Sequence, residues 1–240
     1  MFLTIFGTMK STDPLNYKTV PNAAMHLDPK NPYNIIARIV SYILHPALIP
    51  TYVALLLVWV QQKEYVQMFT VKDVNSWLFN IFLSTFFFPV VFVLLLRALK
   101  FIDSIHLNDA KSRIVPLIGA MLFYFWCNEI FRNIETNFFI KSYVLGSFWG
   151  IIVVFLTNII LKVSMHTSAM GGAIGMTILQ LIIYPSLINL LIFLAVLLLA
   201  GIVGTSRLHL KAHSPKELWV GYALGIGVQV MAYVFLVYIL

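Results

Sequence analysis

Residues 187–217 read LINLLIFLAVLLLAGIVGTSRLHLKAHSPKE and join a long apolar run to a short polar segment. The run at 187–204 has no charged side chain, which is typical of a helix inside a bilayer. The polar segment at 205–217 holds two histidines, one arginine, two lysines and one glutamate. Because charge beside hydrocarbon is costly unless it serves a purpose, this segment is the first candidate for a functional site.

The composition of the chain shows the same contrast. Of its 240 residues, 60% are hydrophobic and only 10% are charged, whereas soluble domains average about 25% charged residues. These values predict an integral membrane protein made of spans and short connections. The net charge of +7 is typical of a membrane protein that contacts anionic headgroups, and nothing in the sequence resembles a nucleic-acid-binding module.

The apolar segments predict an all-α fold, a polytopic transmembrane helical bundle of about six to seven spans. They lie at about 39–60, 77–99, 114–132, 143–163, 167–184, 187–204 and 218–240. Four prolines break residues 1–34, so we expect a polar tail at the membrane surface there and a single transmembrane domain at 35–240. Pro46 and Pro50 interrupt the first segment, and Pro89 is expected to kink the second.

Shorter signals predict local packing. The fifth and sixth segments are joined by the turn Tyr184-Pro-Ser, which predicts a helical hairpin. Gly171, Gly172 and Gly175 near the start of the fifth segment allow close contact with another helix. The single cysteine, Cys127, excludes an intrachain disulfide and is predicted to be a buried structural thiol.

Three polar clusters, separated by pairs of helices, are the main structural signal. They lie at 103–116, 162–167 and 204–217. Each pair of membrane crossings returns the chain to the same side, so the clusters are predicted to face one side and can converge on one pocket. Residues 1–99 are expected to add only helices.

The residue types in these clusters suit a phosphoryl group. His213 and Glu217 stand four residues apart, so on a helix the carboxylate can hold one imidazole nitrogen and leave the other for nucleophilic attack. A second histidine, His166, can give a proton to a leaving oxygen. Cations and hydroxyls can bind phosphate oxygens, and the candidates are Lys111, Arg113, Ser164, Ser206 and Arg207. No metal ion or cofactor is required by this arrangement.

Each cluster also has a simpler structural interpretation. His213 and Glu217 can be a solvated pair at the start of the last helix. His166 can be an interfacial histidine on a helix that Ser164 caps. The cations of the first cluster can be positive-inside anchors.

With these residues the chain resembles the type 2 phosphatidic acid phosphatase superfamily, whose integral membrane lipid phosphatases share a site architecture with vanadium haloperoxidases. That family has three motifs in order, K-x6-R-P, P-S-G-H and S-R-x5-H-x3-D. The third is matched by Ser206, Arg207, His213 and Glu217, with glutamate in place of aspartate. The resemblance covers the segment order from about residue 100 to 240.

The other two motifs are matched in part. Val163-Ser-Met-His166 keeps the serine and the histidine of the second motif, but Met165 stands where the family has a glycine that lends its backbone N–H to the phosphate. Lys111-Ser-Arg113-Ile-Val-Pro116 has the residue types of the first motif without its spacing.

The resemblance implies a role for each matched residue. His213 would be the nucleophile that forms a phosphohistidine, Glu217 would orient it, and His166 would be the general acid. The other matched residues would bind phosphate: Lys111, Arg113, Ser164, Ser206 and Arg207.

The resemblance therefore implies a membrane lipid phosphatase, a hydrolase of a phosphoric monoester or diphosphate. Its substrate would be a lipid phosphate or an isoprenoid (pyro)phosphate, and its expected location is a bacterial cell membrane. One alternative is a non-catalytic lipid or anion transporter, or a binding protein, on the same scaffold. Another is a structural subunit, in which the three clusters would not converge.

Overall fold

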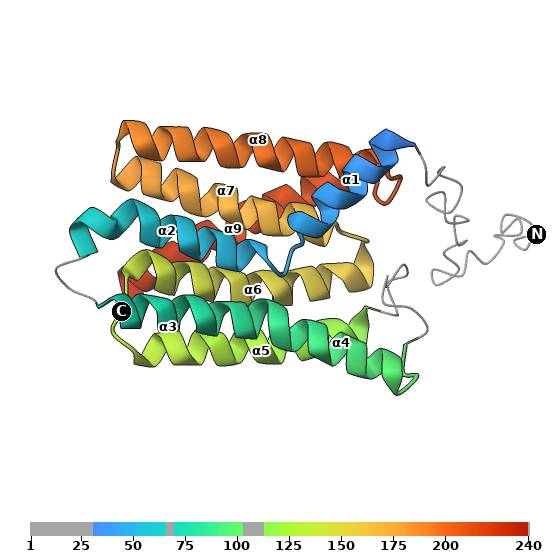
Figure 1. The fold of residues 1–240 in the computed structure, drawn as a ribbon, viewed down its shortest axis with the longest axis horizontal. Helices are drawn as coiled ribbons and strands as arrows, with labels where there is room; N and C mark the ends of the chain where they lie inside the picture. The colour runs from blue at the N-terminus through green and yellow to red at the C-terminus, as the bar shows by residue number, and fades with distance from the viewer. Residues whose placement is uncertain (1–30, 66–69, 103–112, 240) are drawn as a thin grey trace, which may run out of the picture.

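Helices make up nearly all of the part of the chain that the computed structural model describes, residues 31–65, 70–102 and 113–239, and no strand occurs within these ranges. Most of the helices run alongside one another as a bundle (Figure 1). The elements are α1 Pro32–Ile43, α2 Ile49–Tyr65, α3 Val71–Phe82, the π-helix η2 Leu83–Phe87, α4 Phe88–Ala98, α5 Ile114–Asn133, α6 Phe138–Ile160, α7 Met165–Ile183, α8 Leu187–His209 and α9 Pro215–Ile239. The predicted all-α class is confirmed.

Six helices of the described residues are long and apolar enough to cross a membrane. One of them, Val71–Ala98, runs through α3, η2 and α4, and the others are α5 to α9. Many leucines of α8 point outward, among them Leu187 and Leu198, which are 72% and 67% exposed. An outer surface of this kind is soluble in lipid rather than in water, so the chain is an integral membrane protein.

The first apolar segment is two helices rather than one. α1 ends at Ile43 and α2 begins at Ile49, and Pro46 lies in the break between them. Pro50 is tolerated because it stands in the first turn of α2, where its missing N–H has no helical partner to lose. The sequence predicted one interrupted apolar segment here, whereas the structure has two separate helices, α1 and α2.

The polar tail predicted at 1–34 ends earlier than expected. α1 begins at Pro32, and the side chain of Asn31 accepts a hydrogen bond from the N–H of Tyr33 at 3.0 Å. Proline at the first helical position and asparagine at the N-cap together favour a helix start. Residues 1–30 lie outside the described residues.

The second apolar segment is longer than predicted at its start. Thr70 and Asp73 form a capping box, in which each side chain accepts a hydrogen bond from the other's backbone N–H, and this box starts α3 at Val71. Pro89 is the second residue of α4, which begins where the π-helical turn Leu83–Phe87 ends. Where a kink was predicted, the structure has this π-helical turn, whose wider turn accommodates a proline that has no N–H and clashes with the preceding turn.

α7 and α8 form the predicted hairpin, and α7 packs closely against α9. A Cβ atom added at Gly171 would lie 2.5 Å from the carbonyl oxygen of Tyr222, and one added at Gly225 would overlap the carbonyl oxygen of Ser168. The two backbones can approach this closely only because both positions are glycine. Gly172 differs, because a Cβ atom there would meet nothing within 4 Å.

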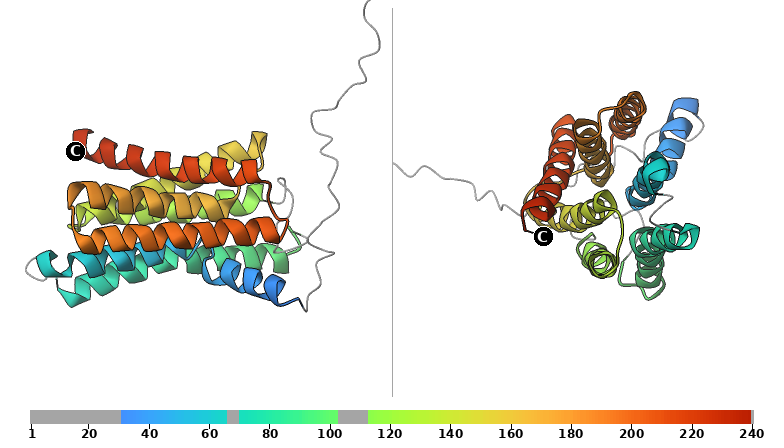
Figure 2. Two further views of the ribbon diagram at one scale, coloured as in Figure 1. Left: turned by 90° about the horizontal axis from the view of Figure 1, so that it is seen from above. Right: turned by 90° about the vertical axis from the view of Figure 1, so that its left-hand side faces the viewer.

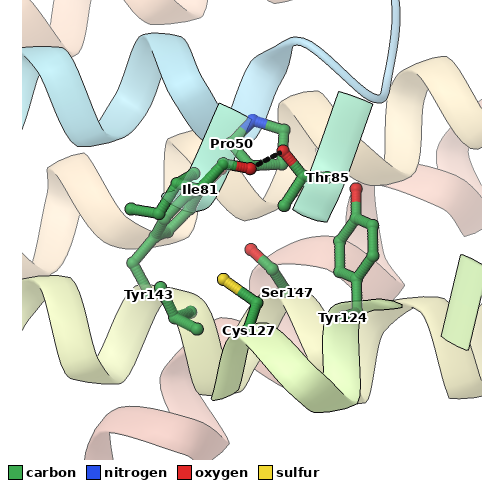
Figure 3. Close-up of a pocket in the computed structure, with 8 residues that line it drawn as sticks. Pro50, Ile81, Thr85, Tyr124, Cys127, Tyr143 and Ser147 are labelled. Carbon is green, nitrogen blue, oxygen red and sulfur yellow. Dashed lines mark hydrogen bonds between the residues drawn. The ribbon is translucent and has the colours of Figure 1, made fainter. Parts of the chain in front are cut away.

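The bundle core lies where α2, α3 and α5 to α8 meet, and it contains Leu57, Ile81 and Phe131. A cavity of about 10 Å³ lies in this region, with Cys127 in its wall and the hydroxyl of Thr85 donating to the carbonyl of Ile81 at 2.8 Å (Figure 3). This volume is at the lower limit for a single water molecule, so the cavity is no ligand site. Cys127 is 1% exposed, which confirms the predicted buried thiol.

The ends of the helices confirm the predicted parity. α6 ends, α7 begins, α8 ends and α9 begins at one end of the bundle, on the right in Figure 1, and α5 also begins there. The ammonium of Lys162 donates to the carbonyl of Ala212 at 3.2 Å, and the N–H of Ser164 donates to the carbonyl of Glu217 at 3.5 Å. We call this end, with its loops, the polar end.

Candidate functional site

A histidine and a carboxylate in contact form the centre of the polar end. Nδ1 of His213 lies 2.7 Å from Oε2 of Glu217, and the two side chains are only 5% and 19% exposed. Pro215 begins α9 and the N–H of Glu217 donates to the hydroxyl of Ser214 at 3.4 Å, so the first turn of this helix sets the spacing. The i, i+4 pair predicted from the sequence is therefore a partly buried contact rather than a solvated surface pair.

The surroundings of His213 keep its ring neutral. Burial lowers the pKa of His213 to about 2, and the nearby charges of Arg207, Lys162 and Arg113 act in the same direction. A carboxylate accepts hydrogen bonds, so a neutral ring donates to it from Nδ1 and keeps its lone pair on Nε2. No hydrogen-bond partner of Nε2 is found within residues 31–65, 70–102 and 113–239. This is the protonation state that a nucleophilic imidazole needs.

Arginines from two different helices supply the positive charge. Arg113, at the start of α5, is 7% exposed, and Arg207, in the last turn of α8, is half-buried. The Nε–H of Arg207 is buried and has no hydrogen-bond partner in the part of the chain that the structure describes. A buried guanidinium N–H without a hydrogen-bond partner favours an anionic ligand, so Arg207 makes this end of the bundle suited to an anionic group.

Two helix starts add partial positive charge at the same place. The first N–H groups of α7 and α9 have no partner inside their own helices. The hydrogen bond from Ser164 to Glu217 brings these two starts together. Helix N-termini attract anions, so the backbone and the arginines favour the same kind of ligand.

His166 lies in the first turn of α7 and contacts α1, a helix that the sequence analysis did not assign to the site. Its Nε2 lies 3.1 Å from the carbonyl oxygen of Ser41, and its ring packs edge-on against His45 with centroids 5.8 Å apart. Burial and the charge of Arg207 lower the pKa of His45. His166 also lies within electrostatic range of His213. The two predicted histidines thus share one site.

The two candidate serines are committed to helix backbone. The hydroxyl of Ser164 accepts from the N–H of Thr167 at 3.4 Å as the N-cap of α7, and this side chain is fully buried. The hydroxyl of Ser206 donates to the carbonyl of Ile202 at 2.8 Å within α8. Both serines are brought to the polar end as predicted, but the contacts of their side chains are structural.

The structure brings the candidates that it describes to the polar end. These residues are Arg113, Ser164, His166, Ser206, Arg207, His213 and Glu217. Lys111 lies outside the described residues.

The expectation that residues 1–99 add only helices is wrong. α1 contributes Ser41, whose hydroxyl accepts from Nη1 of Arg207 at 3.3 Å, and Asn34, whose Oδ1 lies 2.9 Å from Nε2 of His209. The signal in the sequence was the spacing of Asn34, Ala37 and Ser41, which places small and polar side chains on one face of an otherwise apolar helix.

Taken together, the site combines a neutral histidine paired with a carboxylate, a second histidine, two arginines and two helix starts. This set of groups can bind a phosphoryl group and attack it. Comparison of the chain with protein-family models, with curated proteins and with solved structures finds no match, so its function must be argued from these residues.

Proposed function

We propose that this membrane protein is a lipid phosphatase that acts through a phosphohistidine. The observation that carries the proposal is the partly buried His213–Glu217 pair, with a contact of 2.7 Å, beside Arg207 and Arg113. A nucleophile for a phosphate dianion needs positive charge beside it, and Arg207, Lys162 and Arg113 lie within electrostatic range of His213.

The reaction follows from the groups at hand. Nε2 of His213 attacks phosphorus while the bond between phosphorus and the lipid oxygen breaks, and His166 gives a proton to that oxygen. Arg207 and Arg113 stabilise the charge on the transferring phosphoryl group, and Glu217 stabilises the positive charge on the ring of His213. Water then attacks the phosphohistidine, His166 takes its proton, and inorganic phosphate leaves.

The substrate class follows from the position of the site. The polar end lies at the ends of helices whose outer surfaces are apolar. An acyl or prenyl chain can remain in lipid while its phosphate reaches the histidines, so lipid phosphates and isoprenoid (pyro)phosphates are the proposed substrates, with a bacterial cell membrane as the proposed location.

Substitution of the nucleophile tests the proposal. In purified protein in detergent, His213→Ala is expected to reduce phosphate release from phosphatidic acid by about 10³-fold or more. The control is Lys216→Ala, which changes an exposed lysine in the same helical turn and is expected to retain activity. Full activity in the His213→Ala protein would refute the mechanism.

Two inhibitors provide a second check on the same enzyme. Orthovanadate resembles five-coordinate phosphorus and is expected to inhibit, whereas EDTA is expected to leave the rate unchanged, because the histidine mechanism uses no metal ion. Loss of activity on chelation would indicate a metal-dependent hydrolase instead.

A second candidate is an anion-binding protein or lipid transporter without catalysis. It is supported by the serine contacts, since Ser164 and Ser206 use their hydroxyls within helices, and by Met165 in place of the motif glycine. Binding of orthovanadate or lipid phosphate with no phosphate release across a panel of lipid phosphates would favour this candidate.

A further inference from the structure

α1 covers one side of the polar end. Asn34, Ala37 and Ser41 face inward and are buried, while Ile36 and Tyr42 face outward and are exposed. The helix packs beside the C-terminal part of α8 and lies on the outside of the bundle (Figure 2). Its inner face therefore meets the site, and its apolar outer face is turned away from the bundle.

Ser41 contacts both a histidine and an arginine of the site. Its backbone carbonyl lies 3.1 Å from Nε2 of His166, and its hydroxyl lies 3.3 Å from Nη1 of Arg207. The hydroxyl donates its own hydrogen to the carbonyl of Ala37 at 2.8 Å. A guanidinium has only donors, so Nη1 of Arg207 donates to the hydroxyl oxygen of Ser41, which is free to accept because its own hydrogen goes to Ala37.

The carbonyl of Ser41 determines the tautomer of His166. A carbonyl oxygen only accepts, so Nε2 of His166 must carry a hydrogen, and a neutral ring then has its lone pair on Nδ1. Ser41 lies in the last turn of α1, where carbonyl groups have no partner within the helix.

We propose that Ser41 is a positioning residue of the site: its carbonyl holds His166 in the Nε2–H tautomer, and its hydroxyl holds the side chain of Arg207 in place for a phosphoryl group. Nδ1 of His166 then carries the proton that passes to the leaving oxygen as the phosphorus–oxygen bond breaks. The ring returns to neutral with its Nε2–H still bonded to Ser41. The role in proton transfer rests on the proposed phosphatase function.

Substitution of Ser41 tests the arginine contact. Ser41→Ala removes the hydroxyl but keeps the backbone carbonyl, so KM for phosphatidic acid is expected to rise by about 3- to 10-fold with kcat within about twofold of the wild-type value. Ser41→Thr restores the hydroxyl and is expected to restore KM. The control is Ser76→Ala, because the exposed Ser76 also donates to the carbonyl four residues earlier but lies on α3. An unchanged KM in Ser41→Ala, or an equal loss in Ser41→Thr, would overturn the proposal.

The tautomer can be measured without any activity. NMR of protein labelled with ¹⁵N-histidine distinguishes the two neutral forms, and the His166 signals are assigned by their loss in His166→Gln. An Nε2–H form at His166 supports the proposal, and an Nδ1–H form overturns it.

Binding separates a failure of this proposal from a failure of the phosphatase function. The added stability that orthovanadate gives to the wild-type protein is expected to be smaller in Ser41→Ala at the same concentration. If the wild-type protein releases no phosphate but this difference is found, the phosphatase function fails and the positioning role of Ser41 at an anion site stands. Equal stabilisation of both proteins would overturn the positioning role.

Discussion

Glu217 reaches the imidazole of His213 across one helical turn, although the motif that it resembles has the shorter aspartate at this position. The contact of 2.7 Å shows that the extra methylene is absorbed by the geometry of the turn. The turn also bonds to its neighbours, since the N–H of Glu217 donates to Ser214 and its carbonyl accepts from Ser164. At the scale of single residues, the backbone of Glu217 is therefore held at both its N–H and its carbonyl, and its carboxylate contacts His213.

The pKa of His213 leads to a prediction about stability. In the folded protein, burial and nearby cations lower this pKa, while the unfolded chain has the ordinary value of about 6.5. Below pH 6.5 the unfolded state therefore binds more protons, and the free energy of unfolding falls by up to about 1.4 kcal/mol per pH unit for this group. Above pH 6.5 the contribution of His213 is fully present.

Thermal unfolding in detergent at pH 5 to 8, in buffer without phosphate, measures this effect. His213→Gln removes the titrating group and is expected to flatten the decline of Tm on the acid side. His45 has a lowered pKa too, so part of the decline is expected to remain. Identical pH profiles for the wild-type and variant proteins would contradict the prediction.

The contact between α7 and α9 determines where the second and third clusters meet. Glycines on both helices let the backbones approach. The first turn of α7 carries His166, and the first turn of α9 carries Glu217, the partner of His213. At the scale of elements, the site therefore depends on the packing of α7 against α9. The glycines that allow this packing lie one to several helical turns from the histidines. A change in this packing is expected to alter the distance between His166 and His213.

Two glycines on α9 provide a matched test of this packing. A Cβ atom at Gly225 would overlap the backbone of α7, so Gly225→Ala is expected to destabilise the protein by about 1–3 kcal/mol and to lower Tm. A Cβ atom at Gly227 would meet nothing within 4 Å, so Gly227→Ala is expected to keep or raise Tm, because alanine favours helices. Equal Tm values for the two variants would show that the close approach does not exist.

The whole molecule places the three polar clusters at one end of a bundle of membrane-spanning helices, as far as the structure describes them. α4 ends, α5 begins and the α6–α7 and α8–α9 connections lie at this end, and the α5–α6 and α7–α8 connections lie at the other (Figure 1). At this scale, the even number of crossings between clusters is what brings distant residues to the same surface.

Labelling of introduced cysteines tests this topology. In a Cys127→Ser background, a membrane-impermeant maleimide is expected to reach Leu99→Cys and Lys216→Cys from one side of sealed membranes. Glu135→Cys and Pro185→Cys are expected to react only from the opposite side, and all four native side chains are exposed. Reaction of Leu99→Cys and Lys216→Cys from different sides would refute the shared polar end.

The sequence by itself determined the features that depend on neighbouring residues. Apolar runs of sufficient length predicted the spans, the number of crossings predicted a shared polar end, and the i, i+4 spacing predicted the contact between His213 and Glu217. These predictions succeed because hydropathy and helical periodicity are local, and because every pair of crossings reverses the chain twice.

Only the tertiary structure decided what lies against the histidines. The contact of Ser41 with His166 joins positions 125 residues apart, and its contact with Arg207 joins positions 166 apart. Nothing in the local pattern predicts such pairs, because they depend on how α1 packs beside α8. The structure likewise decided that Ser164 and Ser206 bond to helix backbone, since serine hydroxyls readily bond to nearby backbone groups.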